Sequence, residues 1–334
     1  MSVPAIVAAG DLRAAKAIYG ESKAYLEMGG VPLVARTVAT LQAVPEVGEV
    51  WVVGNAERLS GVLGHDALRS ALRKPLHVVP QFRNLYENGW ETFRRLLPGA
   101  GPDGRDPEPS DADTAVLYLP VDIPFATPEE ISAFVRQSLE ADCDYSLGLV
   151  TEEAMRGFYP STPGGPGIRM AYFNLREGRF RQSNLHLIRP ARIRNRHYID
   201  EMYEHRHQRE FGPIVALAWR LLRSERGGFG VLWYFLLMHL AGLVDRWGLT
   251  FAADALRRLI PTARIERGVS SLLGGSFRLI VTEAGGCAAD IDTEADFDAA
   301  KLCFDVWGKA QRERAARLYG ALLPLSAGSR EPPA

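Results

Sequence analysis

The sequence has few of the features that mark secreted, membrane-spanning or nucleic-acid-binding proteins. Among 334 residues there are three cysteines, Cys143, Cys287 and Cys303, and no CxxC pair. This argues against a structural zinc site and suits a reducing, cytoplasmic compartment. The formal net charge is −1, so there is no electrostatic argument for nucleic acid or an anionic membrane as a partner. The N-terminus has no basic flank before its apolar stretch, and we expect a strand there rather than a signal peptide.

Long apolar runs are also scarce, and the one that needs an explanation is FGVLWYFLLMHLAGLV at 229–244. It approaches the length of a membrane-spanning helix only when its glycines are counted. It contains His239, and Arg226 and Asp245 flank it. A packed helix, an interfacial helix that contacts lipid and a true span are all open. We prefer the packed helix, because a span would separate the two halves of the candidate site described below.

What is present is the composition of an ordinary globular protein, with 47% apolar and 24% charged residues and enough chain for an ample core. Short apolar segments alternate with helical patterns, which predicts an α/β fold with a parallel sheet and right-handed crossovers. The expected strands are 3–9, 49–55, 77–79, 114–122, 145–150 and 277–283, with a strand pair around Glu177-Gly178. The expected helices are 31–43, 57–72, 85–97, 129–141 and a long one near the C-terminus.

The pattern changes at residues 196–262, which contain almost nothing strand-like and are rich in arginine, histidine and aromatic residues. We therefore predict one domain built from 1–195 and 263–325, a helical insertion at 196–262, and a disordered tail at 326–334. Aromatic residues beside arginines in the insertion would suit a lipid-linked acceptor, a membrane surface or a homodimer interface. Packing in the core is the preferred interpretation.

The first motif follows the opening strand, which breaks at Gly10 and runs into a polar loop with Arg13, Lys16 and Lys23. Backbone N–H groups at a glycine turn can donate to phosphate oxygens, and basic side chains can neutralise them. Every first strand of an α/β domain must end in a turn, so Gly10 alone indicates little. The turn at 29–33, Gly-Gly-Val-Pro-Leu, leads directly into a helical pattern and strengthens the prediction of a polyphosphate site.

The second motif is an aspartate at the end of an apolar strand. Asp122 is followed by Pro124, and a helix is expected to begin near Thr127 with Pro128 in its first turn. Open α/β sheets bind ligands at the carboxyl ends of their strands, and a carboxylate there is a natural magnesium ligand. A turn-forming aspartate is the alternative interpretation.

The third motif is Asp290-Ile291-Asp292-Thr293. In an extended segment, alternation places Asp290 and Asp292 on the same side, where they would face one metal ion. The alternative is helix N-terminal chemistry, with Thr293 as the cap and Glu294 and Asp296 in the first turn. We interpret the motif as both, with the later residues capping and one of the two earlier aspartates reaching the metal.

The order of these motifs resembles the MobA-like nucleotidyltransferase family. The matching elements are the AAG turn, a lysine before GG-x-P-L, D-x-P-F after a strand, and D-I-D-T before a C-terminal helix. The family includes molybdenum-cofactor guanylyl- and cytidylyltransferases, methylerythritol-phosphate cytidylyltransferases and sugar-phosphate nucleotidylyltransferases. The resemblance covers roughly 3–190 and 277–305. It implies a three-layer α/β/α, Rossmann-like fold of the GT-A type with a mostly parallel sheet.

The resemblance also implies roles for individual residues. The nucleoside triphosphate would be bound by Ala8, Ala9, Gly10, Arg13, Lys16 and Lys23, with Asn88 at the base or ribose. The metal, Mg²⁺, would be held by Asp122 and Asp292, with Asp290 as the alternative ligand. Asn184 would line the acceptor side, although asparagines also commonly cap helices and form turns.

The expected reaction is nucleotidyl transfer, in which an acceptor phosphate oxygen attacks the α-phosphorus of a nucleoside triphosphate and expels pyrophosphate. Lys23, Asp122 and Asp292 would be the catalytic residues, and the second substrate would be a phosphorylated small molecule. The loop GDLRAAKAIYGESK is longer and has fewer glycines than the family pattern G-x-G-x-R-M-G. Two alternatives therefore stay open: a GT-A glycosyltransferase that uses a nucleotide-sugar, and a catalytically degenerate nucleotide-binding scaffold.

Overall fold

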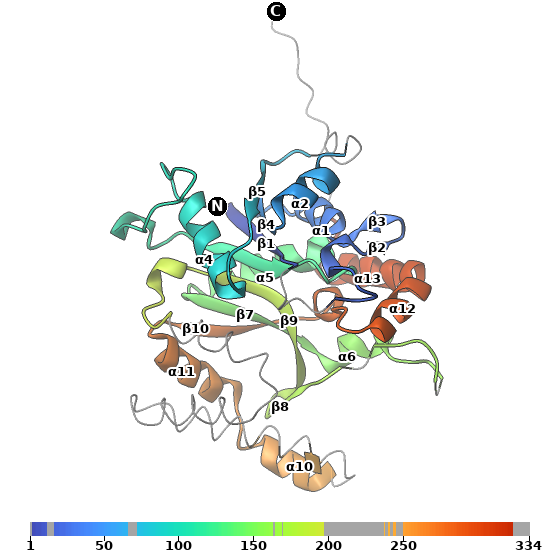
Figure 1. Ribbon diagram of the computed structural model, residues 1–334. Coiled ribbons are helices and arrows are strands. Elements are labelled where there is room, and N and C mark those ends of the chain that lie inside the picture. Colours follow the sequence, from blue (N-terminus) through green and yellow to red (C-terminus); the bar gives the residue numbers. More distant parts are fainter. Residues whose placement is uncertain are drawn as a thin grey trace, which may run out of the picture.

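The structure is a computed structural model, and it describes residues 2–11, 17–65, 72–162, 164–168, 170–196 and 250–322, together with 237, 240, 243 and 244. Within this part of the chain an eight-stranded mixed sheet has the order β10-β7-β9-β6-β1-β4-β5, with β8 paired to β9 (Figure 1). Its strands are β1 (Val3–Ala9), β4 (Val47–Gly54), β5 (Leu76–Pro80), β6 (Val116–Pro120), β7 (Tyr145–Thr151), β8 (Phe173–Leu175), β9 (Gly178–Ile188) and β10 (Phe277–Thr282).

Most neighbouring strands run parallel. β1 pairs in parallel with β4 and β6, β4 with β5, and β10 with β7. β9 runs antiparallel between β6 and β7. The parallel pairs require the crossover helices that the alternating sequence pattern predicts. They also place the carboxyl ends of β1 and β6 side by side, which matters for the candidate site.

Helices cover both faces of the sheet: α1 (Leu33–Gln42), α2 (Ala56–Leu63), α4 (Leu85–Leu96), α5 (Pro128–Glu140) and α11 (Thr262–Leu273). Side chains of β1 alternate between the two faces. Val7 lies in one core cluster with residues of α1, α2 and α5, such as Val38 and Phe134. Ile6 lies in a separate cluster with Phe93 of α4. β1 is therefore buried on both faces, as strands of parallel sheets are, and the predicted three-layer α/β/α fold is confirmed.

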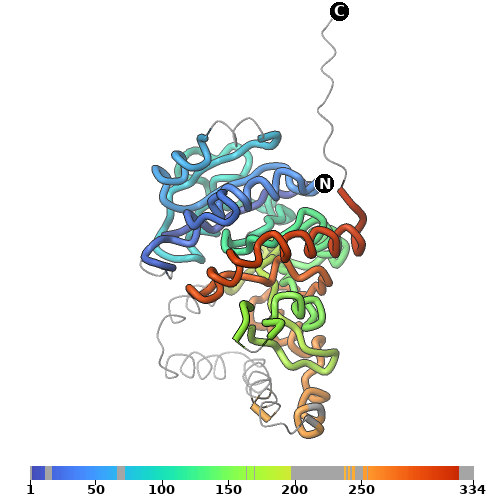
Figure 2. Tube along the Cα trace, turned by 90° about the vertical axis from the view of Figure 1, so that its right-hand side faces the viewer, coloured from blue at the N-terminus to red at the C-terminus, as the bar shows by residue number. Residues whose placement is uncertain are grey.

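The C-terminal helices return to the N-terminal part of the domain. The remaining elements are the hairpin of β2 (Glu27–Met28) and β3 (Val31–Pro32), helices α6 (Glu152–Met155), α10 (Thr250–Arg257), α12 (Glu294–Leu302) and α13 (Phe304–Tyr319), and the 3₁₀ turns η1 (Lys23–Tyr25), η2 (Pro109–Asp111), η3 (Arg156–Phe158), η4 (Pro190–Arg192) and η5 (Gly286–Ala288). Figure 2 shows the red C-terminal helices beside the blue N-terminal segment. The guanidinium of Arg36 in α1 lies 4.5 Å from the centroid of the Phe304 ring.

A second core cluster joins these peripheral elements. Phe125, the last residue of the D-x-P-F motif, is almost fully buried and packs edge-on against Trp307 with ring centroids 5.5 Å apart. Phe158 of η3 and Met28 of β2 are buried in the same cluster. Phe125 thus anchors the segment between β6 and α5 against the C-terminal helices.

The helix caps follow the sequence prediction. Thr127 caps α5, with Pro128 in the first turn. Thr293 caps α12 in a capping box, in which the Thr293 hydroxyl accepts from the Asp296 N–H while the Asp296 carboxylate accepts from the Thr293 N–H. Asp296 therefore has a structural role, which leaves Asp290 and Asp292 for the site.

Two predictions fall largely outside the described residues. The helical insertion at 196–262 is described only in small part, ending in α10, and the tail at 326–334 is not described. Of the apolar run at 229–244, Leu237 is buried against Leu149, Phe180 and Ile260. Among the helices of the described residues, none has both the length and the hydropathy needed to cross a bilayer.

Burial of His186 predicts a specific dependence of stability on pH. Its Nδ1 lies 2.7 Å from the Tyr145 hydroxyl, and burial lowers the pKa of His186 to about 4. Between pH 6.5 and 4 the unfolded chain binds a proton here that the folded chain does not, so stability falls as the pH falls through this window. The loss reaches about 3 kcal/mol. Urea unfolding of His186→Gln, which keeps a polar group for Tyr145, should show a weaker pH dependence than the wild type; equal slopes would contradict the assignment.

Candidate functional site

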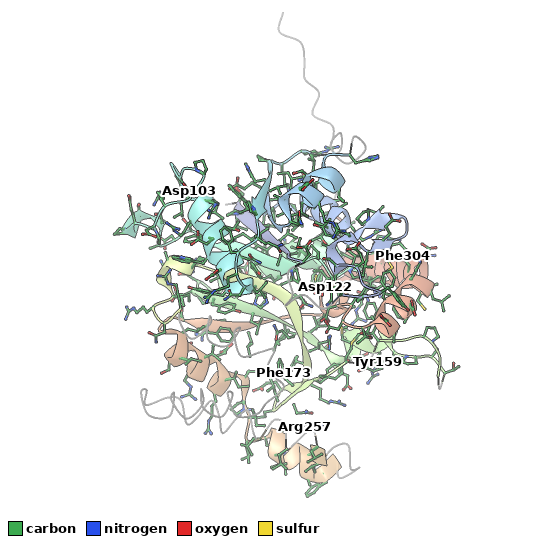
Figure 3. All side chains as sticks on the ribbon, viewed as in Figure 1. Asp103, Asp122, Tyr159, Phe173, Arg257 and Phe304 are labelled. Atoms are coloured by element: carbon green, nitrogen blue, oxygen red, sulfur yellow. The ribbon has the colours of Figure 1, made fainter. Side chains whose placement is uncertain are left out.

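The candidate site lies where three distant parts of the chain meet at the carboxyl edge of the sheet. Ala8 of β1 is in register with Pro120 of β6, so Gly10 and Asp122 follow neighbouring strand ends. Figure 3 labels Asp122 near the middle of the view, where elements from distant parts of the sequence meet. The segment after β10 joins this edge, because the Ile291 N–H donates to the Asp122 carbonyl oxygen at 3.0 Å. The sheet topology thus brings the first and third motifs to the second.

Lys23 links two of the predicted carboxylates. Its Nζ donates to Asp122 Oδ2 at 2.6 Å and to Asp292 Oδ1 at 2.8 Å. The side chains of Lys23 and Asp122 are 17% and 14% exposed, whereas that of Asp292 is 62% exposed. One ammonium group therefore lies between a nearly buried carboxylate and a carboxylate that faces solvent.

The pKa values reflect this shared cation. Burial by itself lowers the pKa of Lys23, but the attraction of Asp122 and Asp292 outweighs it and the pKa is raised. The pKa of Asp292 is lowered, since Lys23 overcomes the opposing effect of burial. Burial raises the pKa of Asp122, and repulsion from Asp290 and Asp292 adds to the rise that Lys23 only partly offsets. The cluster is thus short of positive charge on its buried side.

Asp290 has a different partner. Its carboxylate accepts a hydrogen bond from Nη2 of Arg181, which lies on β9, and the two side chains are similarly buried. Arg181 Nε donates to the Ala288 carbonyl oxygen at 2.7 Å. The two aspartates that the sequence offers as alternative metal ligands thus have different partners: Asp292 shares Lys23 with Asp122, and Asp290 pairs with Arg181.

A second part of the site surrounds Gly10. The Asp11 N–H donates to Gln81 Oε1 at 3.0 Å, and Gln81 Nε2 donates back to Asp11 Oδ1 at 2.7 Å. Asn88, which is buried in α4, accepts from the Phe82 N–H at 2.6 Å. A Cβ placed on Gly10 would lie 3.4 Å from Gln81 Oε1 and 3.5 Å from Asn88 Nδ2. The side-chain amides of Gln81 and Asn88 therefore lie beside the glycine turn.

Asn184 lies in a β-bulge of β9. Leu147 pairs with His186 and Leu149 with Gln182, so β9 has extra residues opposite Gly148. Such bulges redirect side chains. Asn184 Nδ2 donates to the Cys287 carbonyl oxygen at 3.2 Å, so the side chain contacts the segment that carries Asp290 and Asp292.

The predicted site residues divide into three groups. Lys23, Asp122 and Asp292 are brought into direct contact. The strand residues Ala8 and Ala9 are buried in β1 beside Gly10, and Asn88, Asn184 and Asp290 surround the same region through other partners. The loop residues Arg13 and Lys16 lie outside the described residues. Among the described residues, no cluster of three or more His, Cys, Asp and Glu side chains is arranged to hold a metal ion by itself.

Sequence reasoning missed three residues that shape the site: Gln81, Glu130 and Arg181. Gln81 directly follows β5, where a polar residue at the end of a short apolar strand is a usable signal. Arg181 lies in β9 among other polar residues such as Arg179 and Gln182, so the sequence pattern does not mark it. Glu130 lies in the first turn of α5 and has the sequence pattern of an ordinary exposed helix acid, so no sequence signal marks it.

Comparisons with known proteins bear on the family and on the fold. A family model described as the MobA-like NTP transferase domain matches residues 5–224, well over half of the chain. The matched residues include Lys23 and Asp122 and extend beyond residue 196, where the predicted helical insertion begins. Asp290 and Asp292 lie outside the matched residues. Over 123 residues the chain is 32% identical to a 2-C-methyl-D-erythritol 4-phosphate cytidylyltransferase of Chlorobium luteolum. That alignment covers 36% of this chain and 48% of the relative, so the chain spans about half the length of this curated relative.

A solved structure supports the fold. A hypothetical transferase from Thermus thermophilus superposes on this chain with a TM-score of 0.59 and 23% sequence identity. The superposition covers 89% of this chain and 99% of that one.

Replacing Lys23 by a neutral residue should destabilise the protein and increase its stabilisation by a divalent ion. In Lys23→Met the carboxylates of Asp122 and Asp292 face each other without the ammonium group between them, and we expect the free energy of unfolding to fall by about 2 kcal/mol. Millimolar MgCl₂ should then raise the melting temperature of Lys23→Met more than that of the wild type, because no ammonium group competes for the two oxygens. Lys309→Met, which removes an exposed lysine of α13, is the control; equal magnesium effects in all three proteins would contradict this assignment.

Proposed function

The chain belongs to the MobA-like NTP transferase domain family, and from this premise we propose that it transfers a nucleoside monophosphate from a nucleoside triphosphate to a phosphorylated small-molecule acceptor. Pyrophosphate is the second product. The observation that carries the proposal is the contact of Lys23 with both Asp122 and Asp292 at the carboxyl edge of the sheet. This arrangement combines a cation for phosphate oxygens with two hard oxygen ligands for a metal ion.

The donor set fits magnesium. Asp122 Oδ2 and Asp292 Oδ1 lie within hydrogen-bond distance of one ammonium nitrogen, so both oxygens point toward one small volume. Mg²⁺ is usually bound by one or two carboxylates, with waters and substrate phosphates completing its shell. Two converging carboxylates therefore suit an ion that arrives with a triphosphate. When bound, magnesium supplies charge neutralisation and orientation of the phosphate oxygens.

Lys23 has two roles in this proposal. Without substrate it neutralises Asp122 and Asp292, and with substrate its ammonium group is available to the phosphates. Ser22 precedes it, and the buried Ser22 hydroxyl has no hydrogen-bond partner among the described residues, which leaves a further polar group for the same ligand. No covalent protein nucleophile is needed. Catalysis comes from holding the attacking oxygen in line with the leaving group and from stabilising the developing charge.

The two substrates bind on opposite sides of this centre in our proposal. The nucleoside lies toward Gly10, where the absence of a side chain leaves room beside the amides of Gln81 and Asn88. The acceptor lies toward β9, where Arg181 offers a guanidinium group for an acceptor phosphate and Asn184 lies close by. The Arg181 guanidinium is paired with Asp290, so both groups are positioned before the acceptor binds.

Turnover tests the proposal directly. The purified protein with Mg²⁺ and each of the four ribonucleoside triphosphates, offered a panel of phosphorylated sugars, polyols and pterins, should release pyrophosphate. Asp122→Asn should lower the rate at least about 100-fold, because the variant loses a metal-binding charge. Asp103→Asn is the matched control, since Asp103 is exposed and lies far from Asp122 (Figure 3). Unchanged turnover in Asp122→Asn would rule out the assigned site. Triphosphate binding with no turnover across the panel would favour the scaffold alternative.

Ligand-induced stabilisation separates nucleotidyl transfer from glycosyl transfer. With Mg²⁺ present, a triphosphate should raise the melting temperature by several degrees at concentrations well above its Kd. Nucleotide-sugars should have a smaller effect, since they carry less negative charge for Lys23 to neutralise. Lys23→Met should remove most of the difference between the two ligand classes. Greater stabilisation by nucleotide-sugars than by triphosphates would favour the glycosyltransferase alternative.

A further inference from the structure

Glu130 is a fully buried carboxylate that the proposed reaction does not use. It lies in the first turn of α5 and is 0% exposed. Its Oε1 accepts hydrogen bonds from the Thr282 hydroxyl at 3.0 Å and the Gly285 N–H at 3.1 Å, and its Oε2 accepts from the Cys287 N–H at 3.0 Å. All three partners are donors, which is what an acceptor-only carboxylate requires when it is buried without a cation.

Two of the three donors belong to the segment that leads to the metal ligands. Residues 283–292 connect β10 to α12, and they include Gly285, Cys287, Asp290 and Asp292. The segment is closely packed: Gly285 has φ 104°, and a Cβ on Gly286 would lie 2.0 Å from the Phe125 carbonyl oxygen. The segment therefore has little freedom to move, and Glu130 holds it at Gly285 and Cys287.

The same stretch of chain holds both sides of the metal site. Residues 122–130 begin with Asp122 and end with Glu130 in the first turn of α5. The Asp122 carbonyl oxygen accepts from the Ile291 N–H, between the two other aspartates, while Glu130 holds the segment several residues upstream. The distance from Asp122 to Asp292 thus depends on the short connection 122–130, which enters α5 at the helix cap Thr127.

We propose that Glu130 is a positioning residue that holds segment 283–292 so that Asp292 stays within reach of a metal ion bound by Asp122. This inference rests on the proposed function, since it assigns Glu130 to the metal site of that reaction. Groups that orient metal ligands typically change metal affinity or activity by about 10–100-fold when they are replaced. A purely structural carboxylate would change stability instead and leave metal binding intact.

The decisive variant is Glu130→Gln, which keeps the shape but presents an amide NH₂ to a backbone N–H donor. We expect the Mg²⁺ concentration for half-maximal pyrophosphate release to rise about tenfold, while the KM for the triphosphate at saturating Mg²⁺ changes little. A second readout needs no turnover: titration of Mn²⁺ with a non-hydrolysable triphosphate analogue, followed by electron paramagnetic resonance, should show a similar loss of affinity.

Thr282→Val is the matched control. It removes the third donor to Glu130, but Thr282 lies in β10 and not in the segment. We expect lower stability and an unchanged Mg²⁺ requirement. A wild-type Mg²⁺ requirement in Glu130→Gln, or equal changes in Glu130→Gln and Thr282→Val, would overturn the inference and leave Glu130 with a structural role.

Two further outcomes are separable. If Glu130→Gln does not fold, Gly285→Ala provides the second test, because a Cβ there would lie 2.9 Å from the Ala154 carbonyl oxygen and displace the segment without changing α5. It should raise the Mg²⁺ requirement, and an unchanged requirement would overturn the inference. If the wild type neither binds Mn²⁺ with the analogue nor releases pyrophosphate, the proposed function fails and the inference fails with it.

Discussion

The interaction on which the site depends is the contact of one ammonium group with two carboxylates that are far apart in the sequence. Lys23 lies 99 residues from Asp122 and 269 residues from Asp292. Such a contact forms only when the first loop, the end of β6 and the segment after β10 reach the same edge of the sheet. Bringing distant segments together costs conformational entropy, and burial of the strands offsets this loss. The ion pairs contribute little to it, because they are partly exposed and individually weak. The sheet therefore positions the charges on which the proposed ligand binding depends.

The antiparallel strand β9 completes this arrangement. A purely parallel sheet would bring only strand ends and loops to the site, whereas β9 crosses the sheet between β6 and β7 and supplies side chains from its interior. Arg181 and Asn184 both come from β9, and both contact carbonyl oxygens of the segment that carries Asp290 and Asp292. Glu130 holds that segment from α5. Three residues from two elements therefore fix one loop, which gives the loop the positional accuracy that the proposed metal binding needs.

Much of this could be predicted from the sequence, because the strongest signals are local. Strand β1 and the caps Thr127 and Thr293 follow from apolar runs and turn residues. The motif order assigns Lys23, Asp122 and Asp292 to one site, and the structure brings these three side chains together. The pairing of Asp290 with Arg181 could not be predicted, since it depends on the register of β9 with its neighbours and on the bulge near Asn184. The role of Glu130 could not be predicted for a related reason. An acid in the first helical turn is usually explained by the helix dipole, and only the tertiary fold shows that the carboxylate oxygens of Glu130 accept from backbone N–H groups.

The charges of the site also bear on which ligand would suit it. Asp122, Asp290 and Asp292 exceed the two cations Lys23 and Arg181 by one negative charge, and burial makes the deficit most costly at Asp122. A protein can reduce such a cost by losing an acid or by binding a cation. Lys23 bridges Asp122 and Asp292, and Arg181 of β9 pairs with Asp290. The one negative charge that remains favours a divalent cation between these carboxylates, in agreement with the metal site proposed above.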